Sequence, residues 1–151
     1  MKLVYKLKSE TSDLLKDIGL LIARVGIGLS IALAHGMGKI DAYSAHSSGF
    51  PDPLGVGNEI SMALAIFAEL VCGLLLVIGL GTRLALTQLI ATMSVAIYCH
   101  LTIFGDTLFA APGKSSAELA LMYLLPFIAL MFTGPGRFSV DHVLVKKFAG
   151  K

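Results

Sequence analysis

The sequence predicts an all-α membrane protein that folds as one antiparallel bundle of four transmembrane helices. Of the 151 residues, 56% are hydrophobic and only 15% are charged, and the mean hydropathy is +0.82. A soluble domain usually carries about 25% charged residues, and a soluble chain of this length would lack the polar surface to cover so apolar a core. Intrinsic disorder needs the opposite composition and is excluded. The length suits a single domain spanning residues 1–151.

Four apolar stretches approach the roughly 20 residues that a membrane-spanning helix needs. The predicted spans cover residues 18–38, 58–80, 84–104 and 116–134. Asn58 and Thr82 are typical of helix starts, Ser115 precedes the fourth span, and Gly134-Pro135 follows it. The segment 79–83 is so short that the second and third spans are expected to form an antiparallel hairpin.

The C-terminal tail is expected to form a short amphipathic helix over residues 139–148. Val140, Val143, Leu144 and Phe148 fall on one face of it, and the two lysines fall elsewhere. Such a helix is typical of a segment that lies on the membrane surface.

The basic residues predict the orientation of the spans. One side carries Lys2, Lys6, Lys8, Lys16, Arg83, Arg137, Lys146, Lys147 and Lys151, and the other carries Lys39 and Lys114. The positive-inside rule then places both termini in the cytoplasm, with segments 40–57 and 105–115 outside. Arg24, Asp13 and Asp17 argue against a cleaved signal peptide, so the first span is expected to be retained.

Five ionisable side chains fall inside the predicted spans, where a charge costs several kcal/mol and marks a candidate functional residue. They are Arg24, His35, Glu69, His100 and Glu118. A helical rise of about 1.5 Å per residue places His35, His100 and Glu118 in one layer near the outer face, with Glu69 just beneath it.

The first span carries two stripes at helical spacing. Arg24, Gly28, Ile31, His35 and Lys39 form one stripe that is expected to face the bundle interior. The adjacent stripe of small residues is expected to pack closely within the bundle, or else against a second copy in a homodimer. It consists of Gly26, Ser30, Ala34 and Gly38.

Each candidate residue also has a structural interpretation. Arg24 either reaches the cytoplasmic interface or pairs with Glu69, whose carboxyl in mid-bilayer must be paired or protonated. Glu118 stands three residues after Ser115, which is the spacing of a capping box. For His100 the structural interpretation is a residue that only marks the outer interface, whereas a functional role is favoured for His35.

The outward segment 41–57 carries Phe50 and Leu54 between two prolines, so it is either a lid over the outer mouth of the bundle or an ordinary connection. Cys72 and Cys99 form no CxxC pattern and are expected to be buried packing residues. The net charge of +2 gives no support for nucleic acid as a partner.

Several motifs occur in an order and spacing that resemble the DoxX family over residues 18–142. They are Arg24, His35-Gly36-x-x-Lys39, Glu69 with Gly73-Leu74-Leu75, Thr82-Arg83, Glu118-Leu119, and Gly134-Pro135-Gly136-Arg137-x-Ser139-x-Asp141. The resemblance implies a small four-helix protein of the bacterial inner membrane. Members related to DoxD resemble subunits of a thiosulfate:quinone oxidoreductase, and others are linked to membrane oxidoreductase complexes that handle thiol and oxidative stress.

The leading functional hypothesis is a quinone-interacting membrane subunit of an oxidoreductase system, working with a soluble or membrane redox partner. His35 and His100 would contact the quinone head group, Glu69 and Glu118 would carry protons, and Arg24 would hold the charge of Glu69. Lys39, on the same stripe as His35, is counted with the residues that bind the cofactor.

Two alternatives stay open at this point. One is a non-catalytic anchor or assembly partner for soluble redox enzymes, in which the buried polar residues only fix helix register. The other is a haem held by His35 and His100, because both histidines have the same predicted depth. No short ligand spacing supports a metal site, and four short spans without a broken helix pair fit a solute carrier poorly.

Overall fold

The computed structural model describes residues 2–149, with side chains from residue 11 onward. Within that part of the chain no β-strand forms, and Thr107 and Ser116 make only an isolated bridge. In chain order the helical elements are α1 (Lys2–Ser30), η1 (Ile31–Gly36), α2 (Met37–His46), η2 (Ser47–Gly49), α3 (Asn58–Ile66), η3 (Phe67–Cys72), α4 (Gly73–Ile78), α5 (Thr82–Tyr98), η4 (Cys99–Ile103), α6 (Glu118–Thr133) and α7 (Val140–Ala149). Elements η1, η3 and η4 are π-helical turns, and η2 is a 3₁₀ turn. The prediction of an all-α protein is confirmed.

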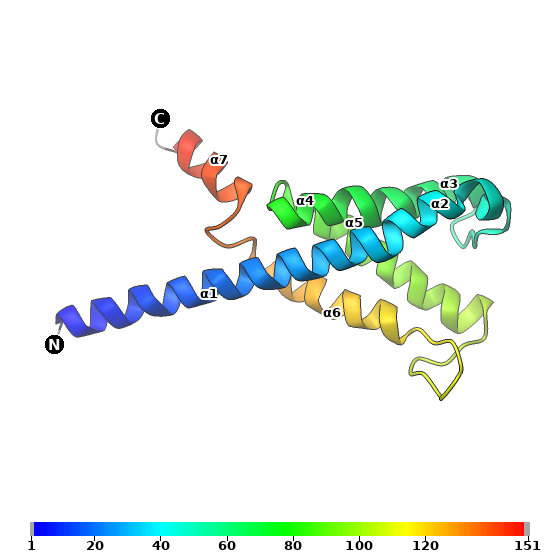
Figure 1. Cartoon of the computed structure of the whole chain (residues 1–151), viewed down its shortest axis with the longest axis horizontal. Coiled ribbons are helices and arrows are strands. Elements are labelled where there is room, and N and C mark those ends of the chain that lie inside the picture. The colour runs from blue at the N-terminus through cyan, green and yellow to red at the C-terminus, as the bar shows by residue number, and fades with distance from the viewer. Residues whose placement is uncertain (1, 150–151) are drawn as a thin grey trace.

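Three continuous helical runs are long and apolar enough to cross a membrane: Thr11–Gly49, Asn58–Ile78 and Thr82–Ile103. Helix α6 (Glu118–Thr133) is apolar but shorter, with 16 residues. Consecutive runs lie antiparallel to one another, and the described chain ends, at the start of α1 and the end of α7, lie at the same end of the bundle (Figure 1). We call this end the base, and the opposite end the open end, because α2 and α3 diverge there from the end of α5 and the start of α6 (Figure 1).

The first helical run is longer than predicted. The predicted span ended at residue 38, but the helix continues through Met37–His46 and the short turn Ser47–Gly49. The segment 41–57 is therefore not a loop throughout, and only residues 50–57 are non-helical. No proline or glycine follows Gly38 until Gly49 and Pro51, so nothing in the local sequence stops the helix earlier.

Apolar side chains form a core along the bundle axis and also cover its outside. Ile31, Leu76 and Leu86 are almost completely buried in the core. In contrast, Leu84 is 78% exposed and Phe132 is 81% exposed. Large apolar side chains on the outer surface suit contact with lipid tails, as in a membrane-embedded protein.

Glycines let the first and second helical runs approach each other closely. A Cβ added to Gly36 would lie 2.8 Å from the backbone nitrogen of Leu70, and one added to Gly28 would lie 2.9 Å from the carbonyl oxygen of Gly73. The predicted inward stripe that contains Gly28 is therefore confirmed. The adjacent stripe of Gly26, Ser30, Ala34 and Gly38 is exposed, so the prediction that it packs within the bundle is wrong.

Helix α7 is joined to the base through Asp141. Its carboxylate accepts the amide N–H groups of Gly81 at 2.7 Å and Thr82 at 2.8 Å, and its own N–H donates to the Gly79 carbonyl at 2.9 Å. Asp141 thus caps the start of α5, the function predicted for Thr82. Burial raises the pKa of Asp141, but the N–H groups of Thr82 and Gly81 and the charge of Arg24 hold that pKa below its ordinary value.

Two glycines on the first run provide a matched pair for testing this packing. The substitution Gly36→Ala should lower the free energy of unfolding by about 2 kcal/mol, because the added methyl group meets the backbone of Leu70. Gly38→Ala should be neutral or slightly stabilising, since no atom lies within 4 Å of its added Cβ. Unfolding in detergent, followed by circular dichroism, measures both changes. Equal stability of the two variants would contradict the close approach.

The Asp141 cap predicts a pH-dependent contribution to stability. Because the folded-state pKa is depressed, the stabilisation is complete above the unfolded pKa of about 3.9 and disappears as the pH falls through the folded value. At pH 7 the free energy of unfolding of the variant Asp141→Asn should therefore be about 1 kcal/mol lower than that of the parent protein. The two unfolding free energies should converge in acid. A difference that is the same at pH 7 and in acid would show that the cap is not ionised.

Candidate functional site

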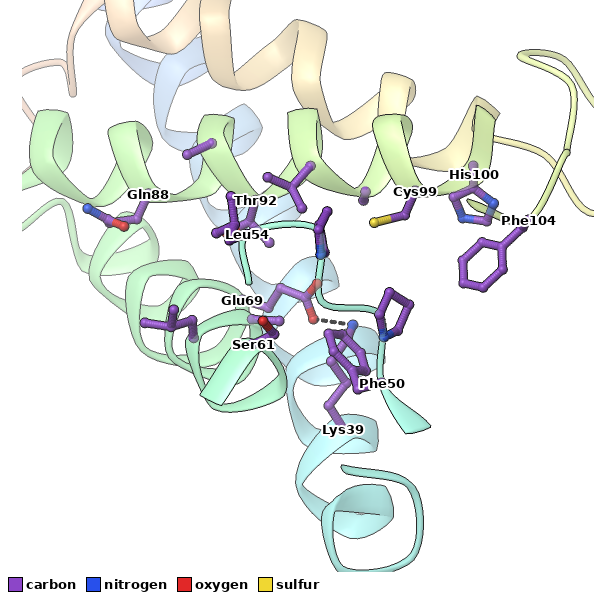
Figure 2. Close-up of a pocket in the computed structure, with 17 residues that line it drawn as sticks. Lys39, Phe50, Leu54, Ser61, Glu69, Gln88, Thr92, Cys99, His100 and Phe104 are labelled. Atoms are coloured by element: carbon purple, nitrogen blue, oxygen red, sulfur yellow. Dashed lines mark hydrogen bonds and ion pairs between the residues drawn. The ribbon is translucent and has the colours of Figure 1, made fainter. Parts of the chain in front are cut away.

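A cavity of about 370 Å³ lies at the open end, between the second and third helical runs. Its lining is mostly apolar and includes a few polar side chains (Figure 2). It is lined by Lys39, Phe50, Pro51, Pro53, Leu54, Ser61, Leu64, Ala65, Glu69, Gln88, Ala91, Thr92, Val95, Ala96, Cys99, His100 and Phe104. A mostly apolar cavity with a few polar groups is the usual form of a small-molecule site.

The segment 50–57 contributes Phe50 and Leu54 to this lining, so it lies over the cavity as the lid interpretation expected. Asp52 fixes the fold of the segment. Its carboxylate accepts the Gly57 N–H at 2.7 Å and the Ser61 hydroxyl at 2.7 Å, which attaches the lid to the start of α3.

Lys39 and Glu69 form an ion pair in the cavity wall. The Nζ of Lys39, in α2, lies 2.6 Å from Oε2 of Glu69, in η3 (Figure 2). The Glu69 side chain is only 5% exposed and that of Lys39 is 25% exposed. The carboxyl of Glu69 thus has a counter-charge, as a buried carboxylate requires. That counter-charge is Lys39, and the expected pairing of Glu69 with Arg24 is wrong.

Arg24 lies at the base, away from the cavity. Its side chain is 1% exposed, and its Nη2 donates to the Phe138 carbonyl at 2.6 Å. The guanidinium packs against Gly79, whose φ of +71° belongs to a left-handed turn and whose missing side chain leaves room for it. Arg24 therefore joins α1 to the segment before α7. It does not pair with Glu69, which was one of its two expected roles.

His100 belongs to a hydrogen-bonded group that lies in the cavity wall apart from the Lys39–Glu69 pair. Its Nδ1 lies 2.7 Å from Oδ2 of Asp106, and the Ser115 hydroxyl donates to the same oxygen at 2.6 Å. These hydrogen bonds from Ser115 and His100 hold the pKa of Asp106 below its ordinary value. Sequence reasoning missed Asp106. The only signal for Asp106 in the sequence was its position six residues after His100, which itself lies within a predicted span.

His35 and Glu118 do not line the cavity. The His35 ring packs edge-on against Tyr123, with ring centroids 5.3 Å apart, and the Tyr123 hydroxyl is hydrogen-bonded to Ser30 at 2.6 Å. Glu69 and Lys39 are near enough to act on His35 electrostatically. The Glu118 carboxylate accepts the Ala110 N–H at 3.0 Å.

The predicted capping box of Ser115 and Glu118 is wrong. Ser115 is bonded to Asp106, and α6 begins at Glu118 without a side-chain cap. Of the six predicted site residues, the cavity brings together Lys39, Glu69 and His100. It does not include Arg24, His35 or Glu118. Within the described residues, no group of three or more His, Cys, Asp or Glu side chains is arranged to hold a metal ion.

Three candidate residues share a backbone feature that the sequence did not reveal. His35 lies in the π-helical turn Ile31–Gly36, Glu69 in Phe67–Cys72 and His100 in Cys99–Ile103. A π turn adds a residue to a helical turn, changes the direction of the side chains around it and is frequent at functional sites. Cys72 and Cys99 also lie in such turns, and both are buried, as predicted. Cys99 in addition lines the cavity.

Comparison with known proteins gives one family and relatives in three organisms. The family model described as DoxX matches residues 19–102. The inner membrane protein YqjF of Escherichia coli is 31% identical over 136 residues, covering 89% of this chain and 98% of that protein. An uncharacterized protein of Haemophilus influenzae is 30% identical, over 76% of this chain and 83% of its own length. The uncharacterized membrane protein Rv3486 of Mycobacterium tuberculosis is 32% identical, covering 65% of this chain and 69% of that protein. No solved structure matches the chain.

The buried ion pair can be tested by a double-mutant cycle. Lys39→Met should lower the free energy of unfolding by about 3 kcal/mol, because it leaves the buried Glu69 carboxylate without a counter-charge. The double variant Lys39→Met with Glu69→Gln should regain most of that loss, since neither residue is then charged. Thermal unfolding in detergent measures the parent protein, Lys39→Met, Glu69→Gln and the double variant. Additive losses in the double variant would show that the two charges are not coupled.

Proposed function

The chain belongs to the DoxX family, and from this premise we propose that its cavity binds the head group of a membrane quinone, as part of an oxidoreductase system. The observation that carries the proposal is the lining of the cavity. Lys39 with Glu69, and His100, which is bonded to Asp106, form two separate polar groups in a mostly apolar cavity.

A quinone requires both parts of this arrangement. Its ring and tail are apolar, and its two ring oxygens lie on opposite sides and need separate hydrogen-bond partners. The Lys39–Glu69 pair and His100 stand apart along the cavity in Figure 2. A volume of about 370 Å³ suits a single substituted ring, because small-molecule sites range from about 300 to 1,000 Å³.

The polar groups take different roles in this proposal. Lys39 and His100 contact the oxygens of the head group, and Glu69 exchanges protons with it, since a carboxylate and an imidazole are the usual proton carriers. His35 and Glu118 lie outside the cavity, so we assign them no contact with the ring. A haem held by His35 and His100 is not proposed, because those two residues do not line one cavity.

For the membrane arrangement, we propose four crossings, with α6 as the fourth. An even number of crossings agrees with the position of both described chain ends at the base (Figure 1). Four of the predicted inward basic residues, Arg83, Arg137, Lys146 and Lys147, lie in or beside α5 and α7 near this end, and Lys151 lies outside the described residues. The positive-inside rule then places the base in the cytoplasm and the cavity in the outer half of a bacterial inner membrane.

A redox role also requires a protein that exchanges electrons with the bound quinone. The exposed small-residue face of Gly26, Ser30, Ala34 and Gly38 offers a surface where another membrane helix can approach closely. Co-purification from the native membrane tests whether a redox protein or a second copy of this chain occupies that face. In the alternative, an assembly partner without a quinone site, such a partner is retained and no ligand is bound.

Ligand-dependent stability is the direct test of the proposed site. Saturating decylubiquinone should raise the unfolding midpoint of the purified protein by roughly 5 °C or more, because a ligand that binds only the folded state stabilises it. The shift should disappear in His100→Leu and in the double variant Lys39→Met with Glu69→Gln. Circular dichroism measures the midpoint, and a chain without tryptophan makes this preferable to tryptophan fluorescence.

Two controls distinguish head-group recognition from general apolar binding. Decylbenzene carries a comparable tail without the ring oxygens and should give little shift. Glu118→Gln alters a carboxylate outside the cavity and should respond to decylubiquinone like the parent protein. The proposal fails if the parent protein shows no shift, or if decylbenzene gives the same shift as the quinone.

A further inference from the structure

We propose that the cavity is selective for the reduced, dihydroxy form of the ring, a hydroquinone, over the oxidised quinone. This inference rests on the proposed function, and it follows from which hydrogen-bonding atoms the cavity leaves for a ligand. A hydroquinone has two O–H donors, whereas a quinone has two carbonyl acceptors. The cavity therefore discriminates between them through those of its polar atoms that can only accept.

His100 supplies the first acceptor, because Asp106 fixes its tautomer. A carboxylate can only accept, so the hydrogen of a neutral His100 ring must be on Nδ1, which lies 2.7 Å from Asp106 Oδ2. The Ser115 hydroxyl, donating to the same oxygen at 2.6 Å, favours the ionised form of Asp106. Nε2 then carries a lone pair. Since His100 lines the cavity and Nδ1 is occupied, Nε2 is the nitrogen left for a ligand.

Glu69 supplies the second acceptor. Lys39 donates to Oε2, which leaves Oε1 without a hydrogen-bond partner among the described residues. As part of an ionised carboxylate, Oε1 can only accept. The remaining N–H groups of Lys39 and the polar groups of Gln88 and Thr92, which also line the cavity, do not discriminate. Each can donate to the oxygen of a hydroxyl group as it can to a carbonyl.

The two ligand forms consequently meet the cavity differently. The O–H groups of a hydroquinone can satisfy His100 Nε2 and Glu69 Oε1, and a quinone leaves both acceptors unpaired in a largely apolar site. An acceptor that loses its water and gains no donor opposes binding, and sites built for a hydroxyl group discriminate strongly against analogues that lack it. We expect the hydroquinone to bind at least about tenfold more tightly than the quinone.

The experiment compares the two forms on the full-length protein in detergent. Decylubiquinone and its hydroquinone, the latter kept under nitrogen, are titrated by calorimetry, and the ratio of the two dissociation constants is the readout. Asp106→Asn is the decisive variant. The amide of asparagine can donate to Nδ1, which moves the ring hydrogen to Nε2 and turns that atom into a donor. The preference for hydroquinone should then fall to about equal binding or reverse.

Ser115→Ala is the matched control, because it removes a hydrogen bond from the same group without changing which ring nitrogen faces Asp106. It should keep the ratio of the parent protein. If Asp106→Asn does not fold, His100→Gln replaces it, since its side-chain amide offers both a donor and an acceptor and should also remove the preference. The ¹⁵N shifts of His100 report the tautomer directly.

The outcomes separate the two proposals. Binding of neither form to the parent protein overturns the proposed quinone site itself. If both forms bind and the quinone binds as tightly as the hydroquinone, the selectivity is wrong and the quinone site stands. The selectivity is also wrong if the ratio is unchanged in Asp106→Asn and in His100→Gln.

Discussion

The ion pair between Lys39 and Glu69 is the interaction on which the open end of the bundle depends. It joins α2 to the π-helical turn Phe67–Cys72 through atoms 2.6 Å apart, in a wall that is otherwise almost entirely apolar. Helices in a bilayer gain little from apolar contact alone, because lipid tails offer the same contact. A desolvated charge pair has few alternative partners in such surroundings, so it fixes the register of the two helices and places a charged group in the cavity wall.

The π-helical turns explain why helical geometry read from the sequence places these residues only in part. A uniform rise and rotation per residue identified the inward stripe that contains Gly28 and His35. It gave no sign that an extra residue widens the helix at His35, Glu69 and His100. Hydropathy reports which segments are apolar, but the same apolar sequence can form an α or a π turn. The choice depends on packing with neighbouring helices, which the sequence of one segment does not contain.

The sequence predicted least well which residue each buried polar side chain bonds to. Hydropathy predicted the helical class and the positions of the helices, and charge in apolar surroundings identified Glu69 and His100. The inward stripe of the first span added Lys39, and these three residues share the cavity. The pairings were less predictable. Arg24 is bonded to the Phe138 carbonyl, 114 positions away, and no composition rule marks a backbone oxygen as a partner. The small residues of the first run were equally hard to interpret. Gly28, Ala32 and Gly36 repeat every four positions, and so does the stripe that begins with Gly26 and Ser30. Only the first of these two sets is buried against the second helical run.

The two polar groups of the cavity belong to different parts of the bundle. Lys39, Glu69 and the lid belong to the first two helical runs, whereas His100 and Asp106 belong to the third and the segment after it. These two halves diverge towards the open end (Figure 1). At the base, the Asp141 cap holds Gly79 after the second run and Thr82 at the start of the third, and the Arg24–Phe138 hydrogen bond joins α1 to the segment before α7. The halves also meet away from the base, because α5 packs against η3, the turn that carries Glu69. The cavity therefore opens beyond this contact, where α5 continues to His100 and the lid departs from α3, and its two polar groups are held by different pairs of elements.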